Sequence, residues 1–259
     1  MKSLIFLLPF MLQADNLKDS LTFHATFSKG VDADFARGDK SIYFAPSYEK
    51  QSEAVKGLGQ ADVAIENGAL RFKSKHTSAL FFKTEGNVSP ATGTFTVRLK
   101  LNPDLDLAPG YCDPIQLTDK AYNDSAIWVD FTRDDKPRNF RMGVFGVLKE
   151  WNPSNLEPDK NPDFPRRLVV VKPAPFNREK WTHIAITYTG LGSGKGSATL
   201  YIDGKVQGSS PVFSEAFHWD PALGAIRLGV NYTGLMDEIA AYNRVLTAKE
   251  IVSLANAKH

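Results

Sequence analysis

Residues 181–204 read WTHIAITYTGLGSGKGSATLYIDG, and this stretch decides the fold. From Ile184 to Tyr188 every second residue is apolar, and the same alternation returns from Ala198 to Ile202. A glycine-rich segment, 190–196, joins the two runs. A period of two places one apolar face and one polar face on each strand, as in an antiparallel sheet that is covered on one side. The stretch therefore predicts two antiparallel strands joined by a flexible hairpin loop.

The same alternation extends over most of the chain. It is clearest in 94–101, 127–132 and 140–144, and weaker strand candidates are 21–27, 69–73, 79–83, 111–118, 167–172, 225–229 and 234–242. The pair Asp203-Gly204 tolerates the positive φ angles of a type I′ turn and so predicts one more hairpin. Many short strands with almost no helical periodicity predict an all-β fold, a two-sheet antiparallel β-sandwich.

One short helix is predicted at the C-terminus, over 248–256. Thr247 is a favourable N-cap and Glu250 stands three residues on, which makes a capping box. Two stretches are irregular: 149–167, with four prolines, and 32–68. A loop as long as the first is usually functional in a compact domain. We expect one domain over 15–259, because no repeat and no linker divides the chain.

The composition excludes several classes of protein. The 259 residues are 42% apolar and 23% charged, with a formal net charge of +2, so collagen-like, coiled-coil and wholly disordered chains are excluded. A dedicated nucleic-acid-binding protein would carry a basic stripe, and the near-zero charge argues against it. Cys112 is the only cysteine, so neither an internal disulfide nor a thiolate metal site is available.

The N-terminus predicts export. Lys2 precedes an apolar run from Leu4 to Leu12, and Ala14 comes just before a polar stretch. This is typical of a secretory signal peptide over 1–14, with a buried first strand as the alternative. The run is far shorter than the about 20 residues that span a bilayer, and no later run reaches that length. We therefore expect an extracytoplasmic chain, secreted, periplasmic or at the cell surface, without an integral membrane span.

The C-terminal third carries a family resemblance. Its motifs are WTHIA (181–185), ATLYIDG (198–204), IRLG (226–229), GLMDEI (234–239) and NRVLTAKEI (243–251). This ensemble resembles the laminin G-like jelly-roll domain of the concanavalin A-like lectin/glucanase superfamily, closely over 181–256 and more loosely over the first strand. The resemblance implies a two-sheet sandwich that binds glycans or proteins, in some members with calcium. The superfamily also contains hydrolases and lyases, so the fold alone does not decide the function.

No catalytic apparatus is evident. Glycoside hydrolysis needs two carboxylates across the sugar bond. The related glucanases carry them in an E-x-D-x-E strand, which is absent here, and Asp130 is the only acid in its strand. A lyase would need a base beside an arginine. His183, Tyr201 and Arg141 could form such a set, but nothing in the sequence places them together.

Several polar residues are candidates for ligand binding. Trp128 and Asp130 share the polar face of one strand, and an aromatic ring beside a carboxylate suits sugar recognition. The other candidates are Arg98, Arg141 and His183, each at a polar position of its strand, and Trp151 in the proline-rich loop. The alternative is that a loop around Trp151 covers Trp128.

The resemblance also suggests a structural calcium ion. Asp237 shares its parity with Leu235, Ile239 and Ala241, so we expect it on an apolar face, where a carboxylate must be paired, hydrogen-bonded or metal-bound. In related domains an acid at this position helps to hold calcium. Asp32 and Asp34, with Asp39, could add side-chain oxygens. Backbone N–H groups around Asp237 and a solvated acidic loop are the alternatives.

These observations favour a secreted, non-catalytic, lectin-like domain protein that binds a glycan or a cell-surface protein. Two other functions stay open: a polysaccharide-degrading hydrolase or lyase with an atypical site, and a structural or adhesion component of a cell envelope.

Overall fold

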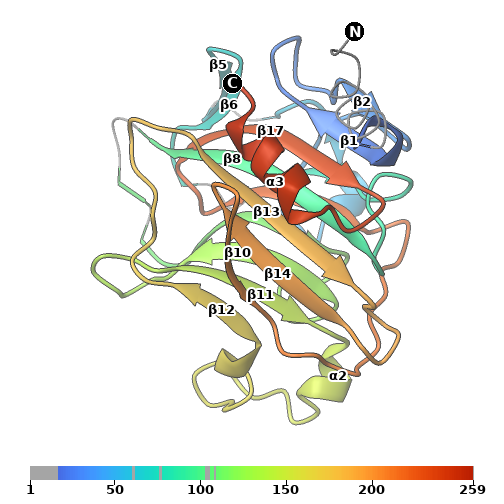
Figure 1. Ribbon diagram of the computed structural model, residues 1–259. Helices are drawn as coiled ribbons and strands as arrows, with labels where there is room; N and C mark the ends of the chain where they lie inside the picture. The colour runs from blue at the N-terminus through green and yellow to red at the C-terminus, as the bar shows by residue number, and fades with distance from the viewer. Residues whose placement is uncertain (1–16, 60–61, 76–77, 103–105, 108, 259) are drawn as a thin grey trace, which may run out of the picture.

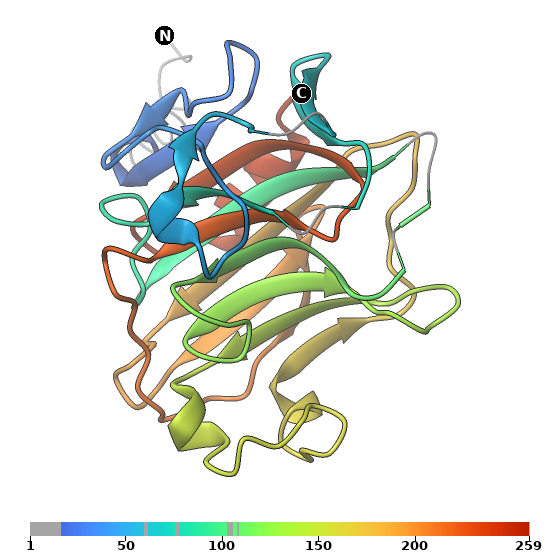
Figure 2. The same ribbon diagram turned by 180° about the vertical axis from the view of Figure 1, so that it is seen from behind.

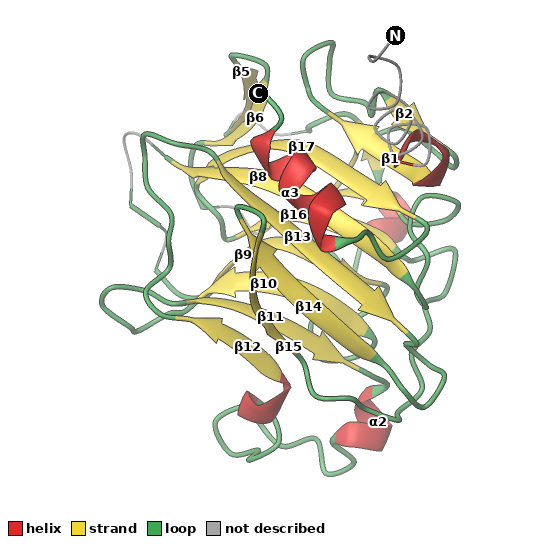
Figure 3. Ribbon diagram, viewed as in Figure 1, coloured by secondary structure: helices red, strands yellow, loops and turns green. Residues whose placement is uncertain are grey.

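The computed structural model describes residues 17–59, 62–75, 78–102, 106–107 and 109–258. Two antiparallel sheets lie face to face; the C-terminal helix lies across the outer side of one sheet, and the other short helical turns lie in loops at the margins of the sandwich (Figures 1 and 3). The predicted all-β sandwich with a short C-terminal helix is confirmed. The predicted signal peptide, 1–14, lies outside the described residues.

The first sheet has nine strands. Its main path runs β15 (Lys205–Ser209), β14 (Ser197–Ile202), β13 (Thr182–Thr189), β8 (Gly93–Leu101), β17 (Gly234–Tyr242), β1 (Leu21–Ala25) and β2 (Phe35–Ala36). In addition, β6 (Ala69–Phe72) pairs with β17, and β5 (Val63–Glu66) pairs with β6.

The second sheet has eight strands. Their order is β12 (Leu168–Val171), β11 (Phe140–Phe145), β10 (Ala126–Phe131), β9 (Cys112–Thr118), β16 (Ala225–Val230), β7 (Ala79–Lys83), β3 (Tyr43–Ala45) and β4 (Val55–Lys56). Figure 2 shows this sheet from its outer side.

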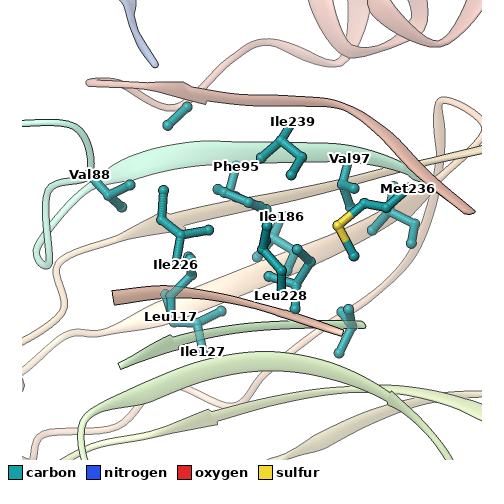
Figure 4. Packing of buried hydrophobic residues seen from close by; sticks show 14 of the residues in the cluster. Val88, Phe95, Val97, Leu117, Ile127, Ile186, Ile226, Leu228, Met236 and Ile239 are labelled. Atoms are coloured by element: carbon teal, nitrogen blue, oxygen red, sulfur yellow. The ribbon is translucent and has the colours of Figure 1, made fainter. Parts of the chain in front are cut away.

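The core lies between the sheets and is built by the alternation. Each strand turns its apolar residues inward, among them Val97 and Ile186 from the nine-stranded sheet and Leu117, Ile127 and Leu228 from the eight-stranded sheet (Figure 4). Burying a side chain of this size contributes about 1.5–3 kcal/mol. The residues between them point outward, so the polar face of each strand becomes part of an outer face of the sandwich.

The helix α3 (Ala248–Asn256) packs on the outer face of the nine-stranded sheet (Figure 1). The capping box is present: the Glu250 backbone N–H donates to Thr247 Oγ1 at 3.3 Å, and the Thr247 N–H donates to Glu250 Oε2 at 2.7 Å. Ile251 and Leu246 are buried beneath the helix. Among the described residues, no helix is long and apolar enough to cross a membrane.

The predicted strands are confirmed, and the two irregular stretches contain more structure than expected. Residues 149–167 include part of the one-turn helix α2 (Leu148–Trp151) and the 3-10 turn η2 (Pro165–Arg167). Residues 32–68 include β2 to β5 and the 3-10 turn η1 (Gln51–Glu53). At the predicted turn both residues have positive φ, 47° at Asp203 and 77° at Gly204.

The predicted face of Asp237 is wrong. The chain bulges between Asp237 and Ala240: Asp237 pairs with Arg98, whereas Ala240 pairs with Thr96, so three steps along β17 match two along β8. Glu238, inside the bulge, has a φ of 51°. The bulge reverses the parity, so that Ile239 enters the core while Asp237 shares the outer side with Arg98.

Candidate functional site

The candidate residues fall on the two opposite outer faces. Trp128, Asp130 and Arg141 lie on the outer face of the eight-stranded sheet, and Trp151, the last residue of α2, packs against this face. Arg98, His183 and Asp237 lie on the outer face of the nine-stranded sheet. The two groups are separated by the core and cannot form one site. The set of His183, Tyr201 and Arg141 that a lyase would need is therefore not formed.

Trp128 is covered, as the alternative expected. Its side chain is 2% exposed, and it packs with Phe145, Trp151 and Phe164, which belong to β11 and the following loop. Its indole stacks on Phe145 with ring centroids 5.9 Å apart. Gly143, opposite it on β11, leaves the space that the indole fills, because a Cβ there would lie 2.2 Å from the ring. Trp128 and Trp151 thus build an aromatic cluster under the loop and offer no exposed stacking surface.

Asp130 and Arg141 form a buried ion pair. They are cross-strand neighbours on β10 and β11; Arg141 Nε donates to Asp130 Oδ1 at 2.8 Å, and Arg141 Nη2 donates to Asp130 Oδ2. This two-pronged arrangement is the strongest that arginine makes with a carboxylate. Burial raises the pKa of Asp130, and Arg141 opposes this shift.

Three further residues extend this pair into a row, which sequence reasoning missed. Gln116 Nε2 donates to Asp113 Oδ2 at 2.5 Å, and burial together with the Asp130 charge raises the pKa of Asp113 to about 7. Arg227 on β16 is the cross-strand neighbour of Gln116 on β9. We call the set Arg227, Gln116, Asp113, Asp130 and Arg141 the polar row.

Two half-exposed tyrosines flank the polar row. Tyr111 is 44% exposed, and the Arg141 guanidinium lies 5.1 Å from its ring centroid. Tyr122 is 36% exposed and packs edge-on against the Trp128 ring. The face therefore combines charged and amide groups, fixed by the sheet, with aromatic side chains that reach solvent. Sugar recognition uses this combination, because ring C–H groups pack on aromatic rings and hydroxyls bond to polar groups.

A signal for one missed residue was present in the sequence. Arg227 interrupts the apolar strand 225–229 between Ile226 and Leu228, which are core residues, so the alternation itself points Arg227 outward. Asp113 carries no such signal. It lies where the pairing of β9 with β10 is irregular, between the pairs Ile115–Val129 and Cys112–Phe131, so the alternation does not predict its face.

The opposite face is occupied by the C-terminal helix. Arg98 Nη2 donates to the carbonyls of Leu254 at 2.9 Å and Ala257 at 3.0 Å, so it caps the C-terminal end of α3. His183 is buried beside it, and burial followed by the Arg98 charge lowers its pKa to about 4. His24 Nε2 lies 2.9 Å from Glu238 Oε2, and this pairing raises the pKa of His24. Arg98 and His183 are thus brought together, in a pocket of about 180 Å³, with Arg98 holding the helix.

The family can now be decided from the sequence. The profile of Laminin_G_3, described as the concanavalin A-like lectin/glucanases superfamily, matches residues 117–252. The chain belongs to this family. No curated protein sequence matches it. The predicted resemblance to a laminin G-like domain is confirmed.

Solved structures share the fold of this laminin G-like chain. One is domain 4 of an extracellular arabinanase from Geobacillus stearothermophilus in complex with arabinotriose, with 16% identity, a TM-score of 0.55, and coverage of 92% of this chain and 98% of the other. Another is the ligand-binding domain of botulinum neurotoxin serotype D in complex with N-acetylneuraminic acid, with 10% identity, a TM-score of 0.59, and 93% and 52% coverage. A third is the Trypanosoma rangeli sialidase, with 13% identity, a TM-score of 0.53, and 92% and 32% coverage. At these identities the likeness concerns the fold alone.

The carboxylates predicted for calcium are not gathered at one point. Asp237 Oδ1 accepts from the Glu238 N–H at 2.7 Å. In the acidic loop, Asp32 Oδ1 accepts from the Ile42 N–H at 3.1 Å, and Asp34 Oδ2 accepts from the Thr26 N–H at 2.9 Å. Across the described parts of the chain, no three His, Cys, Asp or Glu side chains are grouped to hold a metal ion. Calcium needs six to eight oxygens, so these side chains do not supply a ligand set by themselves, and backbone carbonyls would have to provide most of it.

Proposed function

We propose that this laminin G-like protein is a non-catalytic glycan-binding protein whose ligand lies along the outer face of the eight-stranded sheet. The observation that carries the proposal is the polar row with Tyr111 and Tyr122 beside it. The row supplies rigid hydrogen-bonding groups, and the tyrosines supply apolar contact and hydroxyls. The opposite face is less suitable because α3 covers it and employs Arg98.

The comparisons support a carbohydrate ligand. Two of the structures with the same fold are complexes with arabinotriose and N-acetylneuraminic acid, and a botulinum neurotoxin type C structure concerns two ganglioside molecules. Together with the signal-peptide pattern over 1–14, this favours a protein that meets glycans outside the cytoplasm. A cell-surface protein as partner stays an alternative.

A glycan array followed by titration of the best ligand tests the proposal. We expect Tyr111→Ala to weaken binding about tenfold, which corresponds to about 1.4 kcal/mol. Phe35→Ala is the matched control, because Phe35 is 43% exposed but lies at the edge of the other sheet. Equal effects of the two substitutions, or no glycan bound by the wild type, would contradict the proposal.

A second candidate, glycoside cleavage at the same face, is favoured by one observation. Two neighbouring carboxyls lie on this face, and burial raises the pKa of both, that of Asp113 to about 7, while Arg141 opposes the rise at Asp130. A protonated and an ionised carboxyl are the two groups that glycosidases use. A reducing-end assay on bound polysaccharides separates the functions: product that disappears in Asp113→Asn would make the protein an enzyme.

A further inference from the structure

A pocket of about 300 Å³ adjoins one end of the polar row. Its walls come from three places: the segment 46–54 with η1, the turn that follows β9, and the turn that precedes β16. The lining residues are Tyr48, Glu49, Gln51, Ser52, Asp119, Lys120, Leu223 and Arg227. Gln51 Nε2 donates to the Leu223 carbonyl at 2.8 Å and so joins two of the walls. The pocket is therefore formed before a ligand arrives.

Arg227 is a buried cation without a partner within the described chain. Its residue is 4% exposed, its Nε has no hydrogen-bond partner, and no described carboxylate forms an ion pair with it. Its guanidinium lies over the Tyr48 ring, 4.3 Å from the centroid, and this cation–π contact is the only hydrogen-bond, ion-pair or ring interaction of its side chain among the described residues. A buried charge is costly unless it is paired. The side chain lines the pocket, so an anion in the pocket would supply the missing partner.

Two other polar atoms around the pocket also lack partners. They are Tyr48 Oη and Asp119 Oδ1, both buried. Asp119 is held by its other oxygen, because Oδ2 accepts from the Asp220 N–H at 2.7 Å. The unpartnered groups around the pocket are thus one cation, one hydroxyl and one carboxylate oxygen that needs a donor, while Lys120 and Glu49 add one charge of each sign to the lining. A simple anion satisfies Arg227 but leaves Asp119 without a donor, whereas an acidic sugar has both a carboxylate and hydroxyl donors.

We propose that this pocket binds a carboxylate-bearing sugar residue, with the carboxylate on Arg227 and ring hydroxyls on Asp119 Oδ1 and Tyr48 Oη. The inference rests on the proposed glycan-binding function and names the class of sugar. A singly charged carboxylate matches the planar guanidinium. A doubly charged phosphate is less suitable, because Asp119 and Glu49 also act on Arg227 through space. The rest of the glycan can follow the polar row, since Gln116 is the next residue along it.

Matched pairs of glycans test the charge requirement. An array carries uronate oligosaccharides, and beside each the same oligosaccharide with its carboxylates reduced to primary alcohols. We expect wild-type protein to bind the acidic member at least about tenfold more tightly than its reduced partner. Binding of both members with equal affinity would overturn the inference and leave the proposed function standing. Binding of neither, and of no other glycan, would contradict the proposed function as well.

Substitutions place the requirement in this pocket. Arg227→Gln should remove the preference for the acidic member, and Arg166→Gln is the control, because the Arg166 side chain is 75% exposed in another loop. Tyr48→Phe removes only the unpartnered hydroxyl, so it should weaken acidic-glycan binding about threefold while the melting temperature is no lower than that of the wild type. Wild-type affinity of both Arg227→Gln and Tyr48→Phe for the acidic glycans would overturn the inference.

Discussion

The Asp130–Arg141 pair shows what burial does to a charged residue on a sheet face. Removing one partner leaves the other charge buried, which costs about 3–5 kcal/mol. We therefore expect Asp130→Ala to lower the free energy of unfolding by that amount in a denaturant titration. Asp134→Ala is the matched control: the Arg133–Asp134 pair, 2.7 Å apart, is exposed, and its loss should leave the free energy of unfolding nearly unchanged. Similar losses in the two variants would show that Arg141 finds another partner.

Asp113 should make the stability fall as the pH rises. Burial and the Asp130 charge raise its pKa from an ordinary 3.8 to about 7, so between these values the folded state holds a proton that the unfolded state has lost. The contribution of Asp113 to the stability of the protein is therefore fully present below about pH 4 and is lost as the pH rises to about 7. Asp113→Asn should remove this part of the pH dependence and be more stable than the wild type at pH 8. Parallel stability curves from pH 4 to pH 8 would contradict the assignment.

Alternation along the strands could predict on which face of the sheet a residue lies, but not whether a loop buries that residue. It placed Asp130, Arg141, Arg98 and His183 on the outward side of their own strands. Which of them meet is decided by the strand pairing, which brings Asp130 beside Arg141 and Arg98 beside His183. It could not predict that Trp128 is buried, because the segment 149–167 that packs over it has no regular pattern of apolar residues. The prediction for Asp237 failed for another reason. A β-bulge at Glu238 reversed the alternation, and the sequence gives no sign of it, because the residue with positive φ is a glutamate and not a glycine.

At the scale of elements, α3 depends on the sheet beneath it. Helix C-termini leave carbonyls that need donors from outside the helix, and Arg98 from β8 donates to three carbonyls at this end, those of Leu254, Ala255 and Ala257. We expect Arg98→Met to speed amide exchange in 251–256 while the β8 amides stay protected, measured by hydrogen exchange with mass spectrometry. Lys249→Met, on an exposed position of the same helix, should leave exchange unchanged. Equal protection in Arg98→Met and wild type would show that side-chain packing alone holds the helix.

Long elements were predictable and short ones were not. The helix 248–256 was predicted because a capping box marks its first turn, and strands such as 94–101 and 140–144 because several residues repeat the alternation. The strands β2 and β4 have two residues each, which is too few to show a period. Each is an edge strand that pairs with one neighbour, β2 with β1 and β4 with β3. The wall of the acidic-sugar pocket is made from this region, which is why Tyr48 was missed.

At the scale of the whole molecule, the two sheets share one core and should unfold together. A metal ion that binds only the folded chain would therefore raise the melting temperature of the whole domain. The family resemblance predicts calcium at Asp237, whereas the described carboxylates accept backbone N–H groups and are dispersed. From this geometry we expect the same melting temperature at pH 8 with calcium and with a chelator. We also expect Asp237→Asn to melt higher than the wild type, because burial raises the Asp237 pKa to about 7 and the charged form is unfavourable. A chelator-dependent loss of stability in the wild type that is absent from Asp237→Asn would instead establish the calcium site.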